Sequence, residues 1–577
     1  MSFGWVSAAL RSPSPVRRHD RWRSTGWTMP IHPLSSARPR TQDSGSLMRL
    51  ASYLFQRLYD LGASHAFGIP GDTILPLYDA LGESPIRPIL TTHEPSAGFA
   101  ADAYARLKGI GLAVATYGAG ALNMVNAIAQ AYAEKSPVVV LSGAPDITGR
   151  RPDLLVHHKV KTFETQFHIY EQITVASASL SDPAVACREI TRVLEAVRHE
   201  KRPGFLEIPR DMVWVEIIEQ VAHVQGPPDR DASALAEVMQ EIALRFNRSR
   251  TPVILAGIEI MRLGLRDQLV RLAERYNLPV ATSFMGKAVF PEHHPNFIGT
   301  YMGRAGHPYA RRMVEGSDCL LMLGAWLTDT ETGLFTSTIA RHTLIQALAN
   351  EVLVSHHRYE HVGLSEVMAA LLASSEIKPR EFRNEYRPEF SSPGVGSLLA
   401  AVFSELSRLD DRRFVFTTDA GDCLFGSVDL NAEFILNPGY YASMGFGVPA
   451  ALGAALALPN CRPVALVGDG GFQMTGMEIG TLVRYGIDAI VIVLNNGGYR
   501  SLDALGAAPL ICDIPFCDYV RLAEAFGATA VRVRTPEEFR TALHQACNRA
   551  GTSVIETVLP PGDVSPTLRR LGSRTEG

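Results

Sequence analysis

The stretch Pro463-Val-Ala-Leu-Val-Gly-Asp469-Gly-Gly-Phe472, followed by Ala489-Ile-Val-Ile-Val-Leu-Asn495-Asn496-Gly-Gly498, decides the fold of this protein. Each half is an apolar run of strand length that ends in glycines and a polar side chain, and a helical segment to Tyr485 joins the two. A strand–helix–strand crossover makes its two strands parallel, so Asp469 and Asn496 should emerge together at the carboxyl ends of neighbouring strands. The pattern therefore predicts a parallel sheet with a ligand site at this edge.

The oxygen atoms at this edge suit a magnesium ion. Asp469 offers a carboxylate, Asn496 offers an amide oxygen, and backbone carbonyls lie nearby. Mg²⁺ takes few protein ligands and completes its octahedron with phosphate oxygens and water. The flanking glycines let the backbone approach a diphosphate closely. Gly-Asp-Gly alone is common in ordinary turns, so the interpretation depends on the Asn-Asn pair that follows on the next strand.

Strands and helices alternate along most of the chain. Strands are expected at 66–69, 89–92, 111–116 and 137–143, then at 253–256, 280–283 and 319–323. Because these runs are apolar on both faces, we expect an α/β fold of three doubly wound parallel-sheet domains. The domains are placed at 48–223, 234–374 and 397–562. A proline-rich, charged linker is placed at 375–396 and a C-terminal tail at 563–577.

Composition narrows the class of protein. Hydrophobic residues make up 46% of the 577 residues and charged residues 20%, which excludes a disordered chain. The net charge of -4 lacks the basic excess of a nucleic-acid binder, and no apolar run is long enough to span a membrane. Seven cysteines without a CxxC pair are typical of reduced thiols. We therefore expect a cytoplasmic enzyme with neither a nucleic-acid nor a membrane partner.

Residues 1–47 differ from the rest because they are rich in Ser, Arg and Pro. Five prolines interrupt any long amphipathic helix, and no continuous apolar segment indicates a secretory signal. We interpret this stretch as a disordered tail, or as a mis-assigned start ahead of Met48.

The Gly-Asp-Gly and Asn-Asn motifs resemble the metal and diphosphate signature of thiamine diphosphate enzymes, and the resemblance runs from about Met48 to the C-terminus. It implies that Asp469, Asn496 and the carbonyl of Gly498 hold Mg²⁺, which bridges the diphosphate. It also implies pyrimidine-binding, middle and diphosphate-binding domains in that order, in a homodimer or homotetramer with sites at subunit interfaces. Further cofactor contacts implied by the resemblance are Thr116, Asp422, Gly468, Gly470 and Gly471.

Two more positions match this family. Glu94, in Thr92-His-Glu94-Pro, begins a helix, where a carboxylate is favoured by the helix dipole. The resemblance implies that it hydrogen-bonds the pyrimidine ring and activates the cofactor. In Tyr441-Ala442-Ser-Met444, Met444 matches the residue that bends the cofactor, and the Ala442 carbonyl matches its contact to the amino group. Without the neighbouring motifs, Met444 would be interpreted as a core residue.

A third group of residues indicates the branch of the family. Asp72 ends the loop Phe67-Gly-Ile-Pro-Gly71-Asp72, and His157 and His158 are adjacent. Adjacent histidines are by default two solvated side chains, but together with Asp72 they resemble the proton-relay cluster of pyruvate and indolepyruvate decarboxylases. A histidine that titrates near neutrality can pass the proton that releases an aldehyde.

The decarboxylase pattern departs at one position. Pyruvate decarboxylases carry a glutamate six positions after the second Asn of the pair, where this chain has Leu502. Asp503 is not expected to replace it, since one residue along a helix turns the side chain by about 100°. We expect Leu502 and Tyr499 to line a pocket for a bulky apolar substrate group. Arg500 either attracts the substrate carboxylate or faces solvent.

The densest resemblance is to the bacterial, Azospirillum-type phenylpyruvate/indolepyruvate decarboxylases, through Thr165-Gln-Phe167 and Gly421-Asp422-Cys423 among other stretches. It implies a carboxy-lyase that converts an aryl 2-keto acid, phenylpyruvate or indole-3-pyruvate, to an aldehyde and CO₂ without oxidation. Three alternatives stay open. They are an acetolactate-synthase-like carboligase, an FAD-dependent oxidase, and a non-catalytic cofactor-binding paralogue, the last suggested by Leu502.

Overall fold

The computed structural model describes residues 47–218, 230–388, 397–410, 412–508, 511–560 and 562–573. The predicted tail at 1–47 lies outside the described residues except for Leu47, as does the predicted domain end at residue 223. In the described ranges, no helix combines the length and apolar composition that crossing a membrane requires.

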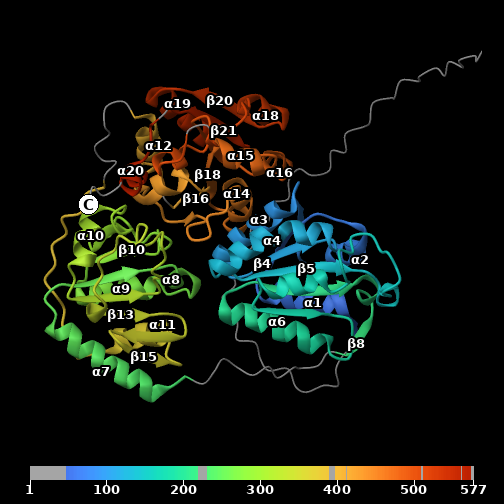
Figure 1. The fold of residues 1–577 in the computed structure, drawn as a ribbon, viewed down its shortest axis with the longest axis horizontal. Coiled ribbons are helices and arrows are strands. Elements are labelled where there is room, and N and C mark those ends of the chain that lie inside the picture. Colours follow the sequence, from blue (N-terminus) through green and yellow to red (C-terminus); the bar gives the residue numbers. More distant parts are fainter. Residues whose placement is uncertain are drawn as a thin grey trace, which may run out of the picture. The chain divides into compact units, whose positions relative to one another are not determined.

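The N-terminal domain is built on a parallel sheet with strand order β3-β2-β4-β5-β7-β6. Its strands are β2 (His65–Gly68), β3 (Arg87–Leu90), β4 (Gly111–Ala115), β5 (Val138–Ala144), β6 (Ala176–Ser179) and β7 (Gly204–Pro209). Its helices are α1 (Leu50–Asp60), α2 (Leu75–Gly82), α3 (Glu94–Lys108), α4 (Ala119–Ala133), α5 (Thr165–Glu171) and α6 (Ala186–Glu200). Helices α3 and α4 cover one face of this sheet, and α1 and α6 cover the other (Figure 1). Apolar side chains fill both layers. The four strands expected here are confirmed.

The middle domain has the strand order β11-β10-β9-β12-β13-β14-β15. The strands are β9 (Pro252–Ala256), β10 (Val280–Ser283), β11 (Phe297–Tyr301), β12 (Cys319–Leu323), β13 (Leu344–Ala347), β14 (Glu351–Val354) and β15 (His357–Glu360). Helices α7 (Ala232–Arg248), α9 (Arg266–Tyr276) and α11 (Leu364–Ala373) cover one face, α10 (Pro308–Glu315) covers the other, and α8 (Glu259–Arg262) follows β9.

One part of the fold prediction needs correction, because the middle sheet is not wholly parallel. Strands β14 and β15 are antiparallel to their neighbours at its edge, while the remaining pairs in this sheet are parallel. The reason lies in the connections: β13 and β14 are separated by residues 348–350, and β14 and β15 by residues 355–356. Links this short can join only antiparallel strands, since a parallel pair needs a long crossover. A further antiparallel pair joins β1 (Leu47–Arg49) to β8 (Glu216–Ile218).

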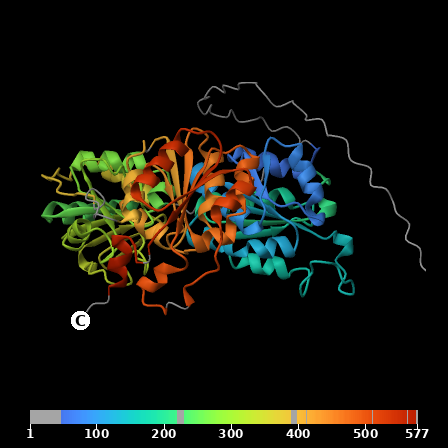
Figure 2. The ribbon, with the colours of Figure 1, turned by 90° about the horizontal axis from the view of Figure 1, so that it is seen from above.

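The C-terminal domain contains the sheet predicted from Asp469 and Asn496, with strand order β17-β16-β18-β19-β21-β20 and all pairs parallel. Its strands are β16 (Phe414–Thr418), β17 (Ile435–Leu436), β18 (Arg462–Gly468), β19 (Ile490–Asn495), β20 (Thr529–Val533) and β21 (Ser553–Val558). Its helices are α12 (Leu398–Leu406), α13 (Asp422–Gly426), α14 (Gly447–Ala457), α15 (Asp469–Thr475), α16 (Glu478–Arg484), α17 (Arg500–Ala504), α18 (Tyr519–Ala525), α19 (Pro536–Cys547) and α20 (Pro566–Gly572). Figure 2 shows these strands, orange to red, running side by side between helices.

Helix α20 corrects the prediction that residues 563–577 form a tail. Asp563 accepts hydrogen bonds from Ser397 Oγ and the Leu399 backbone N–H, and Ser565 bonds to Asp422. Leu568 is fully buried. The stretch 563–573 is therefore folded onto the C-terminal domain, whereas residues 574–577 lie outside the described residues.

The described part of the predicted linker, residues 375–388, packs on the middle domain. Asn384 donates to the Phe297 carbonyl at 2.6 Å, and the ring of Tyr386 stands edge-on to the Phe297 ring at 5.3 Å. Ile377 joins the middle-domain core. Apolar residues within this charged stretch thus anchor residues 375–388 of the predicted linker to the middle domain.

The N- and C-terminal domains of the chain meet through α3 and α14. The two helices come so close that a Cβ on Gly453 would lie 2.1 Å from the Ala100 carbonyl oxygen, so only glycine fits there. Alanines along both helices extend the contact into one shared hydrophobic core. The packing of α3 on α14 therefore fixes the relative position of the N- and C-terminal domains within one chain.

Candidate active site in the C-terminal domain and a polar cluster in the N-terminal domain

Asp469 and Asn496 occupy the ends of two adjacent parallel strands, as the sequence predicts. Strands β18 and β19 are paired from Val464 opposite Ile490 to Gly468 opposite Leu494. Asp469 follows β18 and is almost fully buried. Its Oδ2 accepts the backbone N–H groups of Gly497 and Gly498 at 2.8 and 2.9 Å. Burial raises the pKa of Asp469, although the neighbouring N–H groups oppose this shift.

The side chain of Asn496 has an oxygen atom that no described residue satisfies. Its Oδ1 atom is buried and has no hydrogen-bond partner among the described residues. A buried amide oxygen without a partner is costly, and a cation is one way to satisfy it. Together with the Asp469 carboxylate and the Gly498 carbonyl, Asn496 supplies the oxygen set that Mg²⁺ prefers. The residues present therefore fit a magnesium ion with its diphosphate.

Two positions at this edge of the sheet require glycine because neighbouring atoms come too close to leave room for a Cβ. A Cβ on Gly498 would lie 2.0 Å from the Cys512 carbonyl oxygen, and its φ of 153° is one that other residues rarely adopt. A Cβ on Gly470 would lie 2.3 Å from the Tyr499 ring. Any larger residue at these two positions would push the turns apart and shift the side chains of Asp469 and Asn496.

A cavity of about 540 Å³ opens at this edge of the sheet. Among the described residues, its lining comes entirely from positions 419–559 of the C-terminal domain. The lining contains eleven predicted site residues: Asp422, Ala442, Met444, Gly468, Asp469, Gly470, Gly471, Asn496, Gly498, Tyr499 and Leu502. The predicted residues of the N-terminal domain, namely Asp72, Glu94, Thr116, His157 and His158, do not line it.

Three lining residues have distinctive local structure. Met444 is 38% exposed, so it is part of the cavity wall and not of the core. Ala442 has a φ of 60°, a left-handed conformation that costs free energy in a residue with a side chain. Asp422 accepts hydrogen bonds from the backbone N–H and the hydroxyl of Ser565. Burial raises the pKa of Asp422 to about 6, although these hydrogen bonds oppose the shift.

The cavity also contains Asp419, which sequence reasoning missed. It is almost fully buried and accepts the backbone N–H groups of Gly445 and Gly447, each at 2.9 Å. Burial raises the pKa of Asp419 to about 6 against these donors. Asp419 thereby fixes the backbone on the C-terminal side of Met444. Its position directly after an apolar strand, as for Asp469, is the signal that could have found it.

Leu502 and Asp503 face different surroundings, as the helix geometry predicts. Leu502 lines the cavity, whereas Asp503 does not. The Asp503 carboxylate pairs with Arg500 Nη1 at 3.2 Å, and Arg500 Nη2 pairs with Asp513 at 2.5 Å. The guanidinium of Arg500 is thus held by two carboxylates, which argues against its recruitment by a substrate carboxylate.

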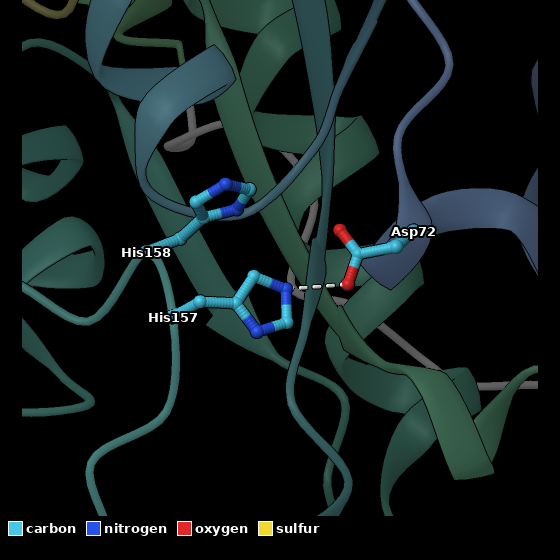
Figure 3. Close-up of side chains that lie close together, drawn as sticks. All are labelled: Asp72, His157 and His158. Atoms are coloured by element: carbon cyan, nitrogen blue, oxygen red, sulfur yellow. Dashed lines mark hydrogen bonds and ion pairs between the residues drawn. The ribbon is translucent and has the colours of Figure 1, made fainter. Parts of the chain in front are cut away.

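The N-terminal domain brings Asp72, His157 and His158 together (Figure 3). His157 Nε2 lies 2.6 Å from Asp72 Oδ2, and the two histidine rings are edge-to-face with centroids 4.7 Å apart. Burial would raise the pKa of the Asp72 carboxyl, but the hydrogen bond and positive field of His157 outweigh it and hold this pKa below its ordinary value. The Nδ1 of His158 is buried without a hydrogen-bond partner among the described residues.

Glu94 and Thr116 lie in the same domain as this cluster. Glu94 begins α3, and its Oε2 accepts a hydrogen bond from Asn123 Nδ2 at 2.8 Å. Thr116 follows β4, and its hydroxyl lies 2.8 Å from that of Thr73, next to Asp72. The predicted polar residues of the N-terminal domain therefore gather at the carboxyl ends of its strands, separate from the cavity lining.

Comparisons with known proteins agree with this arrangement in all three domains. Residues 48–169 match the family described as "Thiamine pyrophosphate enzyme, N-terminal TPP binding domain", residues 239–374 its central domain, and residues 425–557 its C-terminal TPP binding domain. The three-domain fold described above is thus that of a thiamine pyrophosphate enzyme.

Full-length relatives narrow the class. The chain is 40% identical over 534 residues to an indole-3-pyruvate decarboxylase of Azospirillum brasilense, covering 91% of this chain and 98% of the relative. It is 32% identical over 555 residues to an alpha-keto-acid decarboxylase of Mycobacterium tuberculosis, covering 92% and 98%. A similar enzyme of Mycolicibacterium paratuberculosis is also 32% identical, over 90% of this chain. The chain therefore belongs to the thiamine pyrophosphate-dependent 2-keto acid decarboxylase family.

Proposed function

We propose that this protein decarboxylates an aryl 2-keto acid, phenylpyruvate or indole-3-pyruvate, to the aldehyde and CO₂ without oxidation. The preference for an aryl substrate is inferred from the apolar wall of the 540 Å³ cavity, which lies beside the proposed metal-binding oxygens. This wall is formed by Leu424, Phe425, Leu494, Leu502, Leu505 and Leu559. An aromatic side chain gains most from burial against such a wall.

The C-terminal residues hold and orient the cofactor in this proposal. Asp469, Asn496 and the Gly498 carbonyl hold Mg²⁺, and Gly468, Gly470 and Gly471 let the backbone approach the diphosphate. Thiamine diphosphate, when bound, supplies the nucleophilic carbon and the electron sink that 2-keto acid decarboxylation requires. The Ala442 carbonyl and the Met444 side chain set its orientation, and Asp422 shapes the adjoining wall.

The N-terminal residues supply proton chemistry. Glu94 offers a carboxyl group to the pyrimidine ring, and Thr116 supports the same region. Asp72 orients His157 through their 2.6 Å hydrogen bond, so that His157 and His158 can deliver a proton at the reacting carbon. Positioned acid–base groups of this kind contribute roughly 10²–10⁴-fold to rates.

These roles require a second copy of the chain. The cavity is lined by the C-terminal domain alone, whereas Glu94 and the Asp72–His157–His158 cluster belong to the N-terminal domain outside its lining. We propose a homodimer, or a homotetramer built from it, in which each site combines the cavity of one chain with the N-terminal residues of another. Such an arrangement gives two equivalent sites related by a twofold axis.

Product analysis tests the proposed reaction. Phenylpyruvate, indole-3-pyruvate and pyruvate are incubated with the full chain, Mg²⁺ and thiamine diphosphate, beside a Glu94→Gln control. Free aldehyde and CO₂ from the aryl acids, lost in the control, support the proposal. An acyloin without free aldehyde would identify a carboligase instead. Cofactor binding without turnover of any substrate would favour a non-catalytic paralogue, for which the absence of a glutamate at Leu502 is the argument.

A further inference from the structure

The loop from Asn437 to Gly447 carries Ala442 and Met444, and it is held at both ends. Asp419, in the same domain, accepts the N–H groups of Gly445 and Gly447. The other end is held by a residue of the N-terminal domain, more than 300 positions earlier in the chain. The position of this loop therefore depends on contacts between the two domains.

That residue is Glu134, which ends α4 and is fully buried. Its Oε1 accepts the backbone N–H groups of Tyr440 and Tyr441 at 2.9 and 3.0 Å. The next residue, Ala442, is the one with the left-handed φ of 60°. The Glu134 carboxylate thus makes two charge-assisted hydrogen bonds to the two residues that directly precede the strained Ala442. A left-handed conformation of this kind persists only where the surrounding structure holds it in place.

Glu134 is itself held by a buried ion network on α3. Arg106 Nη2 lies 2.9 Å from Glu134 Oε2, and Arg106 makes two further bonds of 2.7 Å to Asp102. Arg106 Nη1 also donates to the Asn437 carbonyl at 2.6 Å. The N-terminal domain therefore holds the loop at two places, the Asn437 carbonyl and the Tyr440–Tyr441 amides.

A buried carboxylate of the C-terminal domain makes the reciprocal contact to the N-terminal domain. Glu478, on α16 of the C-terminal domain, is fully buried. It accepts the backbone N–H of Thr92 at 3.0 Å and the Thr92 hydroxyl at 2.6 Å. Thr92 lies two positions before Glu94. The hydroxyl of Tyr485 accepts the Leu90 N–H at 2.8 Å on the same segment. The C-terminal domain thus holds the backbone that leads to Glu94.

We infer that Glu134 and Glu478 are reciprocal positioning residues, each of which fixes, from the opposite domain of the same chain, a segment that contacts the cofactor. Glu134 sets the loop of Ala442 and Met444, and Glu478 sets the segment of Glu94. The inference rests on the cofactor contacts in the proposed function. Neither glutamate lines the cavity, so each acts through backbone amides and not by touching the cofactor.

The two residues should give separable effects. Loosening the Ala442–Met444 loop removes part of the cofactor-binding surface, so Glu134→Ala should weaken thiamine diphosphate binding. Loosening the Thr92 segment leaves that surface intact but displaces the Glu94 carboxyl. Glu478→Ala should therefore lower kcat while cofactor affinity is retained. A general loss of stability would not divide binding from turnover in this way.

The experiment is a calorimetric titration of the cofactor-free full chain with thiamine diphosphate in saturating Mg²⁺, followed by measurement of kcat at saturating cofactor. Glu331→Ala is the matched control, since Glu331 is a buried carboxylate of the middle domain that accepts the Phe284 and Met285 N–H groups at 2.7 and 2.8 Å. We expect the cofactor dissociation constant to rise about tenfold or more in Glu134→Ala and less than about threefold in Glu331→Ala. In Glu478→Ala, kcat should fall about tenfold or more with cofactor affinity within about threefold of wild type.

Glu134→Gln retains an oxygen acceptor and should lie between wild type and Glu134→Ala. If the alanine variant does not fold, the glutamine variant carries the same comparison. Equal cofactor affinity in wild type, Glu134→Gln and Glu331→Ala would overturn the inference for Glu134. Parallel losses of affinity and kcat in both glutamate variants would also overturn it, because they indicate a structural role only. Failure of the wild type to bind the cofactor would refute the proposed function itself.

Discussion

Asp469 Oδ2 accepts the backbone N–H of Gly498 at 2.9 Å, so the carboxylate at the end of β18 closes the turn that follows β19. The same turn contains Asn496, whose Oδ1 is buried without a partner among the described residues. The Asp469 carboxylate therefore has partners within the protein, whereas the Asn496 oxygen has none among the described residues.

This difference predicts two distinct phenotypes. Asn496→Ala removes the proposed metal ligand but no hydrogen bond of Oδ1, so the cofactor-free protein should keep its Tm while affinity for Mg²⁺ and thiamine diphosphate falls about tenfold or more. Asp469→Asn places an amide group against the N–H donors of the turn, so it should lower both the Tm and the affinity. Thermal unfolding without cofactor and calorimetry with it measure the two effects. A lowered Tm in Asn496→Ala would contradict the assignment of a free ligand oxygen.

Asp72→Asn should lower kcat for an aryl 2-keto acid by about 10²-fold while cofactor affinity is unchanged. The reason is that an asparagine at position 72 no longer gives His157 a negatively charged partner that orients its ring. Asp153→Asn is a matched control, since Asp153 is an exposed acid that pairs with Arg151 on the same loop. Steady-state kinetics with product detection makes the comparison. Equal losses in the two variants would show that the loop, and not the cluster, is at fault.

The lowered pKa of Asp72 also sets the direction of a pH effect. An acid whose pKa is depressed in the folded state stabilises that state above its unfolded pKa, and this stabilisation is lost as the pH falls through the folded pKa. The Asp72–His157 pair should therefore persist down to pH values below the ordinary range of an aspartate. NMR titration of the Asp72 carboxyl carbon checks this, and a midpoint above the ordinary value would contradict it. Because the pair is largely exposed, its contribution to stability should be small.

Leu502→Glu should change substrate preference. Leu502 lines the apolar wall, and a charged group there is poorly solvated beside an aromatic substrate. We expect the ratio of kcat/KM for phenylpyruvate over that for pyruvate to fall about tenfold or more. Leu502→Gln, of similar size but uncharged, separates charge from shape. An unchanged ratio in both variants would remove Leu502 from the substrate pocket.

The contribution of Asp422 to stability should change with pH in the opposite direction from that of Asp72. Its pKa rises from 3.8 to about 6 in the folded state. A raised carboxyl pKa stabilises the fold fully below the unfolded pKa, and this stabilisation is lost as the pH rises from about 4 through about 6. Asp422→Asn removes the ionisation, so its free energy of unfolding relative to wild type should rise by about 2 kcal/mol between about pH 4.5 and pH 7.5. Urea unfolding at pH 4.5 and 7.5 tests this, and a relative stability that is independent of pH would contradict it.

Much of the fold could be predicted because buried parallel strands leave a strong local signal. Runs such as those ending at Asp469 and Asn496 are apolar on both faces, and their crossover allows only one pairing. Strand β15 was missed because three of its four residues are exposed and its pattern is mostly polar. Helix α20 was missed because a short helix near the chain end has little periodicity, and its Ser565 anchor is 143 positions from Asp422.

By itself, the sequence determined which chemical groups meet at the carboxyl ends of strands. A parallel crossover brings Asp469 to Asn496 wherever the rest of the chain lies, and helix geometry turns Asp503 away from Leu502. Only the tertiary structure decided that Asp419 holds the Met444 loop, that Asp513 pairs with Arg500, and that Glu134 reaches Tyr440. These contacts depend on the packing of whole elements, such as α3 on α14, and no local pattern of residues encodes which distant side chain that packing brings near.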